Sequence, residues 1–587
     1  MKHSKRIFRY LSLFLAASVF YSFGSNNSKI SPELLHKTSL QNSNEKNLVW
    51  VFFTDKGPES DFMSSHPESF LTKESIQRRN IRIKNNVKFN ESDKPVSKDY
   101  INDFTNAGII IKQRTKWFNG VSCYLTKNEI DLISNKEYVK NIDVVRTYVK
   151  DREDHIISGP ETEFDTNPNS TFDINYGNSI NQAQIINVPP VHNMGFDGSG
   201  VLIASLDAGF DNLQHPCFEL MRNKGLRTYD FVNGDTIVAD GPGRIGTGRH
   251  GTLTLSLVCG FAPGFLVSPA FNSKFILAKT EIDGIEIRLE EDNWIAAAEW
   301  ADSLGADIIT SSLGYDVFDP PYASYTWEMM DGQTPLITRA ADLAVSKGIV
   351  VVISAGNAGY NQLHNTLSAP ADGDSVITVG SVNNSGVRAG YSSVGPTADG
   401  RIKPDVMAMG SNMYTARFGA GNTGYTGIYF GTSLSCPMVA AVCALMLHAN
   451  PDLSPVDIRN ILRNTSDNNS NPNNLVGWGI IDALAAVKNS ITVNNIIPTE
   501  YKMYQNYPNP FNPSTTFKFN LTRSANVSIV IYDVKGVEVD RAVNNKFFPI
   551  GNNNFTYGNS NLSSGVYFYT MYANGVFIES RKMILLR

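Results

Sequence analysis

The sequence contains little cysteine, few charged residues and no excess of positive charge. Of its 587 residues, 5 are Cys and 18% are charged, and the formal net charge is −5. So few scattered cysteines exclude a disulfide-built scaffold. The slightly acidic balance argues against nucleic acid or an anionic membrane as a partner. A hydrophobic content of 42% is typical of a globular chain, and the length predicts several structural units.

Cysteine and histidine also lack the spacing of a zinc site, so the sequence predicts no metal ligand there. Cys436 and Cys443 are seven positions apart on an expected helix, about 10 Å along its axis, which is too far for a disulfide. Cys217 and Cys259 could pair after export, and the sequence leaves this open.

Long apolar runs are missing except near the N-terminus. Basic residues from Lys2 to Arg9 precede the apolar run Tyr10–Phe23, and two small residues follow it. This run is short for a membrane span, and its basic flank is typical of a cleaved signal peptide at residues 1–25, with a membrane anchor as the alternative. We therefore expect a soluble, extracytoplasmic mature protein without a transmembrane anchor.

The C-terminal region differs in composition from the rest of the chain. Residues 507–514 contain three prolines and read as a turn-rich stretch that no helix could cross. Apolar residues then alternate within Phe517–Leu521 and within Val527–Ile531, and Asn574-Gly575 is a hairpin turn signal. These patterns predict a small all-β unit over residues 501–587, a β-sandwich.

The region 46–150 reads as a small α+β unit. Its expected helices are Glu68–Ile83, Lys98–Asn106 and Lys127–Asn141. Its expected strands are Leu48–Thr54, Ile109–Lys112, Trp117–Leu125 and Asp143–Val149. This mixed order suggests a ferredoxin-like layer. The polar stretch 151–175 has no clear period and is predicted to be a linker.

Residues 176–490 alternate short apolar runs with helical segments. The expected strands are Val201–Leu206, Phe275–Ala278, Ala306–Ile309, Ile349–Ile353 and Val376–Val379, and Trp294–Leu304 and Thr338–Lys347 are expected helices. Continuous apolar strands separated by helices predict an α/β fold, in which a parallel sheet has helices on both faces. In such sheets the chemistry lies at the carboxyl ends of the strands.

Two candidate residues lie at such positions in the first half of this region. Asp207 directly follows the strand Val201–Leu206, which suits an orienting carboxylate, although a strand-end Asp is commonly a turn or cap residue. His250 begins an apolar helix within Arg249-His250-Gly251-Thr252, although alone it could be a surface histidine.

Two more candidates follow. Asn357 comes after the strand Ile349–Ile353 in a stretch of small residues, where its amide could serve as a donor or simply form a turn. Ser433 opens the longest apolar helix, where free N–H groups favour developing negative charge, although Ser is also a common N-cap. Pro437 is expected within the first turn of that helix, where a missing N–H does little harm.

Together the four residue types predict nucleophilic catalysis. A serine needs a base, a histidine base needs a carboxylate to fix its tautomer, and an amide donor stabilises an oxyanion. The order Asp207, His250, Asn357, Ser433 is the Asp–His–Ser order of subtilisin.

The chain resembles the subtilisin-like serine proteases, or subtilases, over about residues 176–490. The resemblance rests on Leu202–Gly209, His250-Gly251-Thr252, Ser354–Asn357 and Gly431-Thr432-Ser433 with Pro437. It implies that Ser433 is the nucleophile, His250 the general base and acid, and Asp207 the residue that orients the ring.

The same resemblance implies the residues that bind the substrate. The Asn357 side chain and the Ser433 backbone N–H would form the oxyanion hole. Ser312, Leu313 and Gly314 would pair with an extended substrate as a β-strand. The sequence departs from the family in having Ala208 where Ser or Thr is usual after the Asp, which removes a hydroxyl near the carboxylate. It also has Leu434-Ser435 where Met-Ala or Phe-Ala is common.

The flanking regions resemble known companions of subtilases. Residues 46–150 are similar to propeptides that assist folding and occlude the cleft, with a mature accessory domain as the alternative. The region from 501 resembles the sorting domain of the type IX secretion system, which implies that machinery as a partner and a secreted or cell-surface location. The alternative, a carbohydrate-binding sandwich, lacks a cluster of Trp. Subtilases often bind Ca²⁺, but no loop here has a recognisable ligand period. No calcium ligand is therefore assigned, and no cofactor is expected to be required.

The sequence therefore predicts a secreted serine endopeptidase, made as an inactive precursor, that hydrolyses protein or peptide substrates through an acyl-enzyme. A catalytically silent cell-surface binding protein is the alternative, suggested by Ala208 alone. An esterase with the same triad is disfavoured because Ser433 lacks a Gly-x-Ser-x-Gly elbow and the chain order differs.

Overall fold

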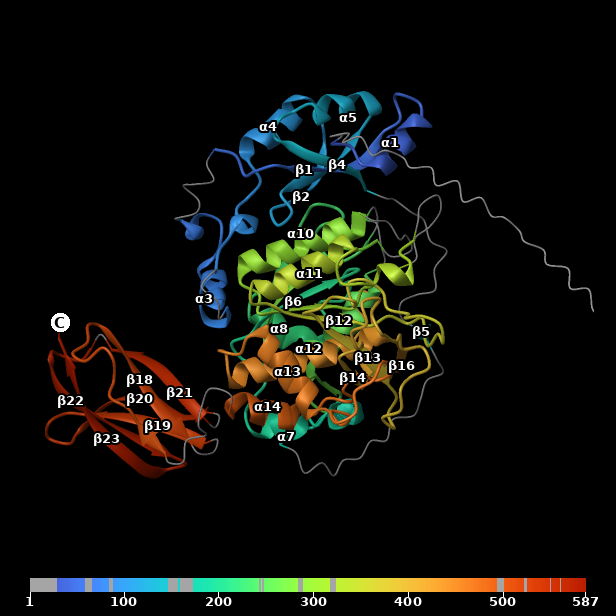
Figure 1. Ribbon diagram of the computed structural model, residues 1–587. Coiled ribbons are helices and arrows are strands. Elements are labelled where there is room, and N and C mark those ends of the chain that lie inside the picture. The colour runs from blue at the N-terminus through green and yellow to red at the C-terminus, as the bar shows by residue number, and fades with distance from the viewer. Residues whose placement is uncertain are drawn as a thin grey trace, which may run out of the picture.

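The computed structural model describes residues 29–586 except 59–65, 84–87, 146–156, 159–172, 242–243, 245–247, 283–288, 317–323, 493–500, 522–524, 549–550 and 560. The predicted signal peptide and most of the predicted linker therefore lie outside the described residues. Figure 1 shows three units along the chain, coloured from blue through green and orange to red. We refer to them below as the N-terminal, central and C-terminal units.

The N-terminal unit is built on an antiparallel sheet in the order β2-β3-β1-β4. Its strands are β1 (Asn47–Phe53), β2 (Ile111–Thr115), β3 (Gly120–Leu125) and β4 (Val139–Val144). Its helices are α1 (Pro32–Ser39), α3 (Lys73–Arg82), α4 (Lys98–Asn106) and α5 (Lys127–Ser134). This strand order is that of a ferredoxin-like layer. Alternate residues of β1 serve the two faces, because Val49 and Val51 belong to the unit's own core whereas Trp50 donates through Nε1 to Asp292 of the central unit at 2.6 Å.

Two expected helices of this unit differ from the structure. The helix expected at Lys127–Asn141 ends at Ser134, because Val139 already pairs with Phe53 as part of β4. The helix expected at Glu68–Ile83 is a short 3₁₀ turn followed by α3. Figure 1 shows α3 away from the sheet and alongside the central unit.

The central unit contains a parallel sheet in the order β14-β13-β12-β11-β6-β10-β7, seven strands within the described residues. These are β6 (Leu202–Asp207), β7 (Arg227–Asp230), β10 (Lys274–Lys279), β11 (Ile308–Ser311), β12 (Val350–Ser354), β13 (Ile377–Val382) and β14 (Val406–Met409). The helices that cover it are α9 (Arg249–Cys259), α10 (Leu289–Leu304), α11 (Leu336–Ser346), α12 (Thr432–Ala449), α13 (Pro455–Thr465) and α14 (Ala483–Thr492). The predicted α/β fold is confirmed.

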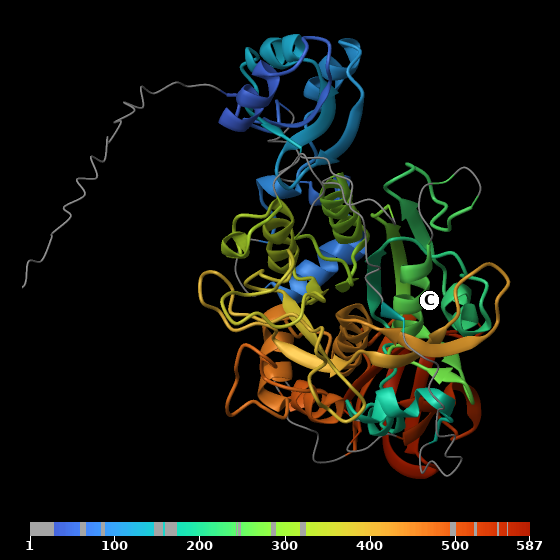
Figure 2. The same cartoon turned by 90° about the vertical axis from the view of Figure 1, so that its right-hand side faces the viewer.

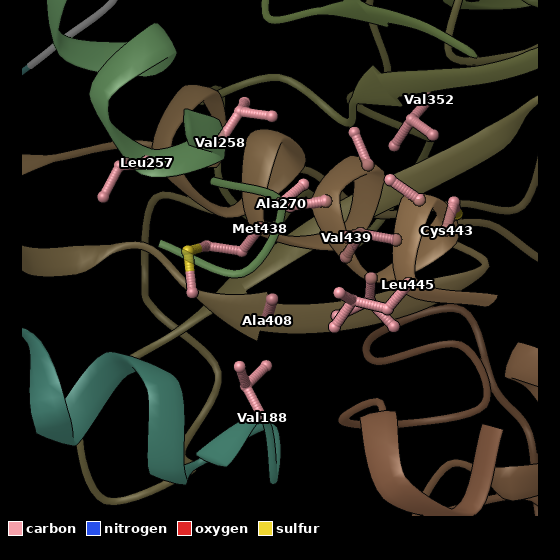
Figure 3. Packing of buried hydrophobic residues seen from close by; sticks show 14 of the residues in the cluster. Val188, Leu257, Val258, Ala270, Val352, Ala408, Met438, Val439, Cys443 and Leu445 are labelled. Carbon is pink, nitrogen blue, oxygen red and sulfur yellow. The ribbon is translucent and has the colours of Figure 1, made fainter. Parts of the chain in front are cut away.

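Alternate residues of each strand serve the two faces of this sheet, as expected for strands buried on both sides. Val350 and Val352 pack with α9 and α12, whereas Val351 and Ile353 pack with α10 and α11. Figure 3 shows Val352 beside Val439 and Cys443 of α12. Within the described residues, α12 alone has the length and hydropathy of a membrane span, and 89% of it is buried inside the fold.

Shorter elements complete the central unit. The helices are α6 (Ile180–Gln184), α7 (Pro189–Asn193) and α8 (Glu219–Asn223), and the strands are β5 (Ile157–Ser158), β8 (Phe261–Ala262), β9 (Leu266–Val267), β15 (Ser411–Ala416) and β16 (Tyr425–Phe430). The strand β5, which follows the N-terminal unit in the chain, pairs with the last two residues of β16. Those two residues closely precede α12 in the sequence, so β5 lies beside the segment that leads into this helix.

The C-terminal unit consists of two packed antiparallel sheets, β17-β18-β21 and β20-β19-β22-β23. The strands are β17 (Lys502–Met503), β18 (Ser514–Leu521), β19 (Ala525–Tyr532), β20 (Glu538–Phe548), β21 (Gly551–Gly558), β22 (Gly565–Ala573) and β23 (Val576–Leu585). The alternating residues of β18 and β19 face each other in one core. Asn574 and Gly575 have φ of 49° and 79°, the backbone of the predicted hairpin turn.

Candidate active site

The carboxyl end of β6 brings the first two predicted residues together. Asp207 is the last residue of β6 and is buried. Its Oδ1 accepts a hydrogen bond from His250 Nδ1 at 2.5 Å and another from the Ala208 backbone N–H at 2.8 Å. Because Nδ1 donates to the carboxylate, Nε2 is the basic nitrogen of the ring.

Gly251 and Thr252, which follow His250, hold the start of α9 against the loop after β6. A Cβ on Gly251 would lie 2.2 Å from the Gly209 carbonyl oxygen, so only glycine lets α9 approach the loop after β6 this closely. Thr252 Oγ1 donates to Asp211 Oδ1 at 3.0 Å and accepts from the Asp211 N–H at 3.1 Å. These contacts fix the start of α9, and hence the imidazole, against the end of β6.

Thr254 is a member of the site that the sequence analysis missed. Its Oγ1 donates to Asp207 Oδ2 at 2.9 Å, so both carboxylate oxygens are hydrogen-bonded. Thr254 lies four residues after His250 on α9, and residues four apart share one face of a helix. That spacing is the signal that could have found it. The Thr254 side chain thus supplies a hydroxyl to the carboxylate, which Ala208 cannot do.

Ser433 is the second residue of α12 and is buried beside the end of β11. Its Oγ donates to the Ser312 carbonyl at 3.1 Å, and Ser312 Oγ donates to the Ser433 carbonyl at 2.8 Å. The second bond has a clear cause. In a regular helix the Ser433 carbonyl would accept from the N–H of residue 437, but that residue is proline.

Pro437 is therefore not in the first turn of α12, where the sequence analysis placed it, because the helix begins at Thr432. Its missing N–H leaves one carbonyl of the helix without a donor, and Ser312 fills that position. This exchange links the carboxyl end of β11 to the start of α12.

Asn357 also contacts the start of α12. Its Oδ1 accepts from the Thr432 N–H and from Thr432 Oγ1, both at 2.9 Å. Since both partners donate, the bonded atom is the amide oxygen, and the NH₂ group is fixed on the other side of the side chain. Gly356 has φ of 108°, and this glycine conformation turns the chain sharply after β12.

The remaining predicted residues follow β11 directly. Ser312 and Leu313 are buried, and Leu313 packs in the core under α10 and α11. A Cβ on Gly314 would lie 2.2 Å from Ser368 Oγ, so this position requires glycine. The backbone of this segment, rather than its side chains, is what remains for binding a ligand chain.

The cysteines take no part in this arrangement. All five are buried free thiols. Cys217 Sγ lies 3.1 Å from His215 Nδ1, and Cys259 Sγ lies 3.6 Å from Met221 Sδ, so the pairing that the sequence left open is not formed. Burial raises the pKa of the Cys436 thiol to about 12. Within the described part of the chain, no group of three or more His, Cys, Asp or Glu is arranged to hold a metal ion.

Comparisons with known proteins identify the family of the central unit. Residues 198–479 match the model of the subtilase family. Subtilisin NAT from Bacillus subtilis subsp. natto is 32% identical over 304 residues, which are 52% of this chain and 70% of that protein. The chain belongs to the subtilase family.

A further relative and one solved structure give similar values. Subtilisin DY from Bacillus licheniformis is 31% identical over 310 residues, covering 52% of this chain and 97% of that protein. A solved structure described as proteases from Pseudoalteromonas arctica PAMC 21717 is 25% identical and covers 54% of this chain and 99% of its own, with a TM-score of 0.42.

Both flanks of the subtilase also match family models. Residues 48–158 match the peptidase S8 propeptide domain of Bacteroidota, and residues 505–585 match the secretion system C-terminal sorting domain. The protein is thus a secreted serine endopeptidase with a propeptide and a type IX sorting domain, exported to the cell surface or beyond. Its substrates are proteins or peptides.

Proposed function

We propose that Ser433, His250 and Asp207 form the catalytic triad of this endopeptidase. The single observation that carries the proposal is the 2.5 Å hydrogen bond from His250 Nδ1 to Asp207, on an aspartate whose other oxygen is held by Thr254. A base with its tautomer fixed in this way is what an unactivated serine needs.

In the proposed reaction, Ser433 Oγ attacks the substrate carbonyl carbon and its proton passes to His250 Nε2. In the precursor that hydroxyl donates to the Ser312 carbonyl, so it must rotate toward the ring. The oxyanion that forms accepts from the Asn357 NH₂ group and the Ser433 N–H. His250 then protonates the leaving amine, and a water molecule, deprotonated by the same ring, hydrolyses the acyl-enzyme.

We further propose that the backbone at Ser312, Leu313 and Gly314 pairs with an extended substrate, so that main-chain hydrogen bonds hold it. The base, the nucleophile and the oxyanion donors are all groups of the chain itself, so the peptidase step requires no cofactor. Calcium, if bound, would act on stability, and a chelator is expected to leave the initial rate unchanged.

For maturation we propose the following arrangement. Residues 1–25 are the signal peptide, 46–150 the propeptide domain, 151–175 the linker, 176–490 the catalytic domain and 501–587 the sorting domain. The maturation cut lies within 150–176. The sorting domain binds the type IX secretion machinery, and the protein needs neither nucleic acid nor a transmembrane anchor. N-terminal sequencing and intact mass of the secreted protein test these boundaries.

The test of the proposed triad is Ser433→Ala in the full chain. We expect casein hydrolysis and self-maturation to be lost, with at least a thousandfold lower rate, because only binding and the oxyanion donors remain. Ser435→Ala is a matched control, since Ser435 is buried on the same helix and donates to the Thr432 carbonyl. Hydrolysis at the wild-type rate by Ser433→Ala would refute the assignment. A wild-type protein that is also inactive and unlabelled by a fluorophosphonate would indicate the catalytically silent alternative.

A further inference from the structure

The helix α3 belongs to the propeptide in sequence but packs on the catalytic domain in space. Figure 1 shows it alongside the central unit, and Figure 2 shows the same blue helix within the outline of that unit. The N–H of Thr72, its N-cap, donates to the Ser303 carbonyl at 3.2 Å. A Cβ on Gly305 would lie 2.6 Å from Glu74 Cβ, so a glycine of the catalytic domain admits the start of the helix.

Arg78 of α3 binds the C-terminal ends of two catalytic-domain helices at once. Its Nη1 donates to the Ala306 carbonyl at 2.8 Å, just after α10, and its Nε donates to the Lys347 carbonyl at 3.3 Å, at the end of α11. The last carbonyls of a helix lack partners within the helix and carry its negative dipole end. One buried guanidinium therefore supplies donors and positive charge to both helices.

The neighbouring Arg79 forms the centre of a buried row of alternating charges. Its Nη2 donates to both carboxylate oxygens of Asp302 at 2.8 and 2.7 Å, and its Nη1 donates to Asp93 at 2.7 Å. Lys347 of the catalytic domain pairs with the same Asp93 at 2.8 Å. The side chains of Arg79, Asp302 and Asp93 are 0% exposed, so each charge depends on the others for solvation.

A third arginine extends this contact to the start of the central sheet. Arg82 pairs with Asp307 at 3.0 Å and donates to the Pro451 carbonyl at 3.2 Å. Asp307 directly precedes β11 and accepts from the Leu202 N–H at 2.7 Å, at the start of β6. These positions lie at the amino ends of the parallel strands, opposite the candidate active site. Pro451 follows α12, whose 18 residues place it about 27 Å from the serine end of that helix.

We propose that the catalytic domain carries, at the ends of α10 and α11, a binding site for the arginine helix α3, and that this remote site keeps the cut propeptide bound after maturation. The occupant is this chain's own segment Lys73–Arg82. The site recognises two adjacent arginines that share Asp302. Arg78 pairs with Asp302 at 2.5 Å and also donates to carbonyls beside the ends of α10 and α11, whereas Arg79 donates to both oxygens of Asp302. The proposal rests on the proposed cut within 150–176, but not on catalysis.

The experiment uses the full chain carrying Ser433→Ala, so that no self-digestion occurs. A recognition sequence for an unrelated site-specific protease is inserted between Ser158 and Asp173, and the cut protein is passed over a size-exclusion column and then diluted to follow dissociation. We expect the propeptide to co-elute. Arg79→Gln is expected to dissociate about a hundredfold faster, because it removes the cation that lies between two fully buried carboxylates, Asp302 and Asp93.

Lys73→Gln is the matched control, since Lys73 is an exposed cation on the same helix. It is expected to dissociate like the parent. If Arg79→Gln is not recovered in soluble form, Arg78→Lys replaces it, because a lysine keeps the charge but cannot reach both helix ends in the planar guanidinium geometry. Dissociation of the arginine variant at the rate of Lys73→Gln would overturn the proposal and assign the attachment to the propeptide sheet and to the pairing of β5 with β16. An inactive wild-type enzyme would refute the proposed triad without affecting this result.

Discussion

The two ends of the central sheet carry two different kinds of site. At the carboxyl ends, a few small polar groups surround one buried pair, Asp207 and His250. At the amino ends, a row of buried charges joins α3 to α10 and α11, with Arg79 at its centre between Asp302 and Asp93. The first arrangement suits proton transfer, which needs one base of fixed tautomer. The second suits attachment, because buried charges that depend on each other select one partner.

The difference also concerns how each site is built along the chain. The candidate active site draws on one domain, and each residue sits at the end of a strand or the start of a helix. The row of alternating charges is complete only when the propeptide is bound, since Arg79 and Asp93 come from one unit and Asp302 and Lys347 from the other. Variants at the carboxyl ends are therefore expected to change kcat, and variants at the amino ends to change the binding of the propeptide.

The largest change in kcat is expected from a substitution at the carboxyl ends of the central strands. Asp207→Asn keeps the shape of the side chain but can no longer hold His250 in the required tautomer, so kcat is expected to fall about 10⁴-fold. Initial rates on a peptide substrate measure this. A loss smaller than tenfold would mean that Asp207 does not orient the base.

The next effect concerns the oxyanion. Asn357→Ala removes one donor and is expected to lower kcat about 10²- to 10³-fold with little change in KM. Thr432→Val is the control, because it removes the hydroxyl that fixes the Asn357 amide but leaves the amide itself. A rise in KM with unchanged kcat would show that Asn357 binds the substrate rather than the transition state.

Thr254 is expected to act as a positioning residue with a smaller effect. Thr254→Val removes a hydrogen bond to a charged group, and we expect kcat to fall about tenfold. Thr254→Ser is expected to restore the rate, and Ala208→Ser in the valine background to restore part of it. Equal kcat in Thr254→Val and the wild type would show that the Asp207 contact has no role in catalysis.

The amino end is expected to respond to pH through Asp302. Burial raises its pKa, but Lys116, Arg78 and Arg79 outweigh this and hold it well below the ordinary 3.8. A carboxyl group whose pKa is lowered in the complex contributes to the stability of the complex above about pH 4. This stabilisation is lost progressively as the pH falls below 4. Propeptide affinity is therefore expected to be constant between pH 5 and 8 for this group and to be weaker at pH 3.

Asp302→Asn provides the reference for that measurement, because Glu299 lies in the same interface. Burial raises the pKa of Glu299, which accepts from the Lys116 and Trp117 N–H groups, so its titration has the opposite sign. The difference in pH dependence between Asp302→Asn and the parent isolates Asp302. An identical dependence in both proteins would contradict the assigned role.

The smallest effect is expected from thiol reagents. Burial raises the pKa of Cys123 and of Cys436 to about 12, so almost no thiolate is present at neutral pH. Iodoacetamide is expected to leave both the activity and the propeptide attachment unchanged. Inactivation at a rate comparable to that of free cysteine would show that a thiol opens to solvent.

Candidate residues at the carboxyl end could be named from the sequence because chemistry restricts residue types there. A nucleophile, base, orienting acid and amide donor at strand and helix ends leave few alternatives, and the structure places Asp207 against His250 as that pattern requires. Thr254 was missed because the sequence was compared with the family at Ala208, whereas the replacement hydroxyl comes from another element. Pro437 was misplaced because α12 already begins at Thr432, and Ser312, far away in the sequence, supplies the hydrogen bond that a proline inside the helix cannot.

The amino end could not be predicted, for a physical reason. Several arginines on one short helix usually indicate a solvated face, and nothing local marks Arg78 and Arg79 as buried. Their burial depends on carbonyls and carboxylates more than 200 residues away, such as Asp302. The prediction of a helix through Asn141 was wrong for a similar reason. Val139 pairs with β1 and is therefore a strand residue.

The most direct test of the central claim is labelling of the secreted protein with a fluorophosphonate, followed by peptide mapping of the labelled residue. Only a serine activated by a neighbouring base reacts rapidly. The account predicts that the label is found on Ser433 in the wild type and is absent in His250→Ala, while Arg79→Gln is labelled normally once mature. Label on another residue, or undiminished labelling of Ser433 in His250→Ala, would contradict it.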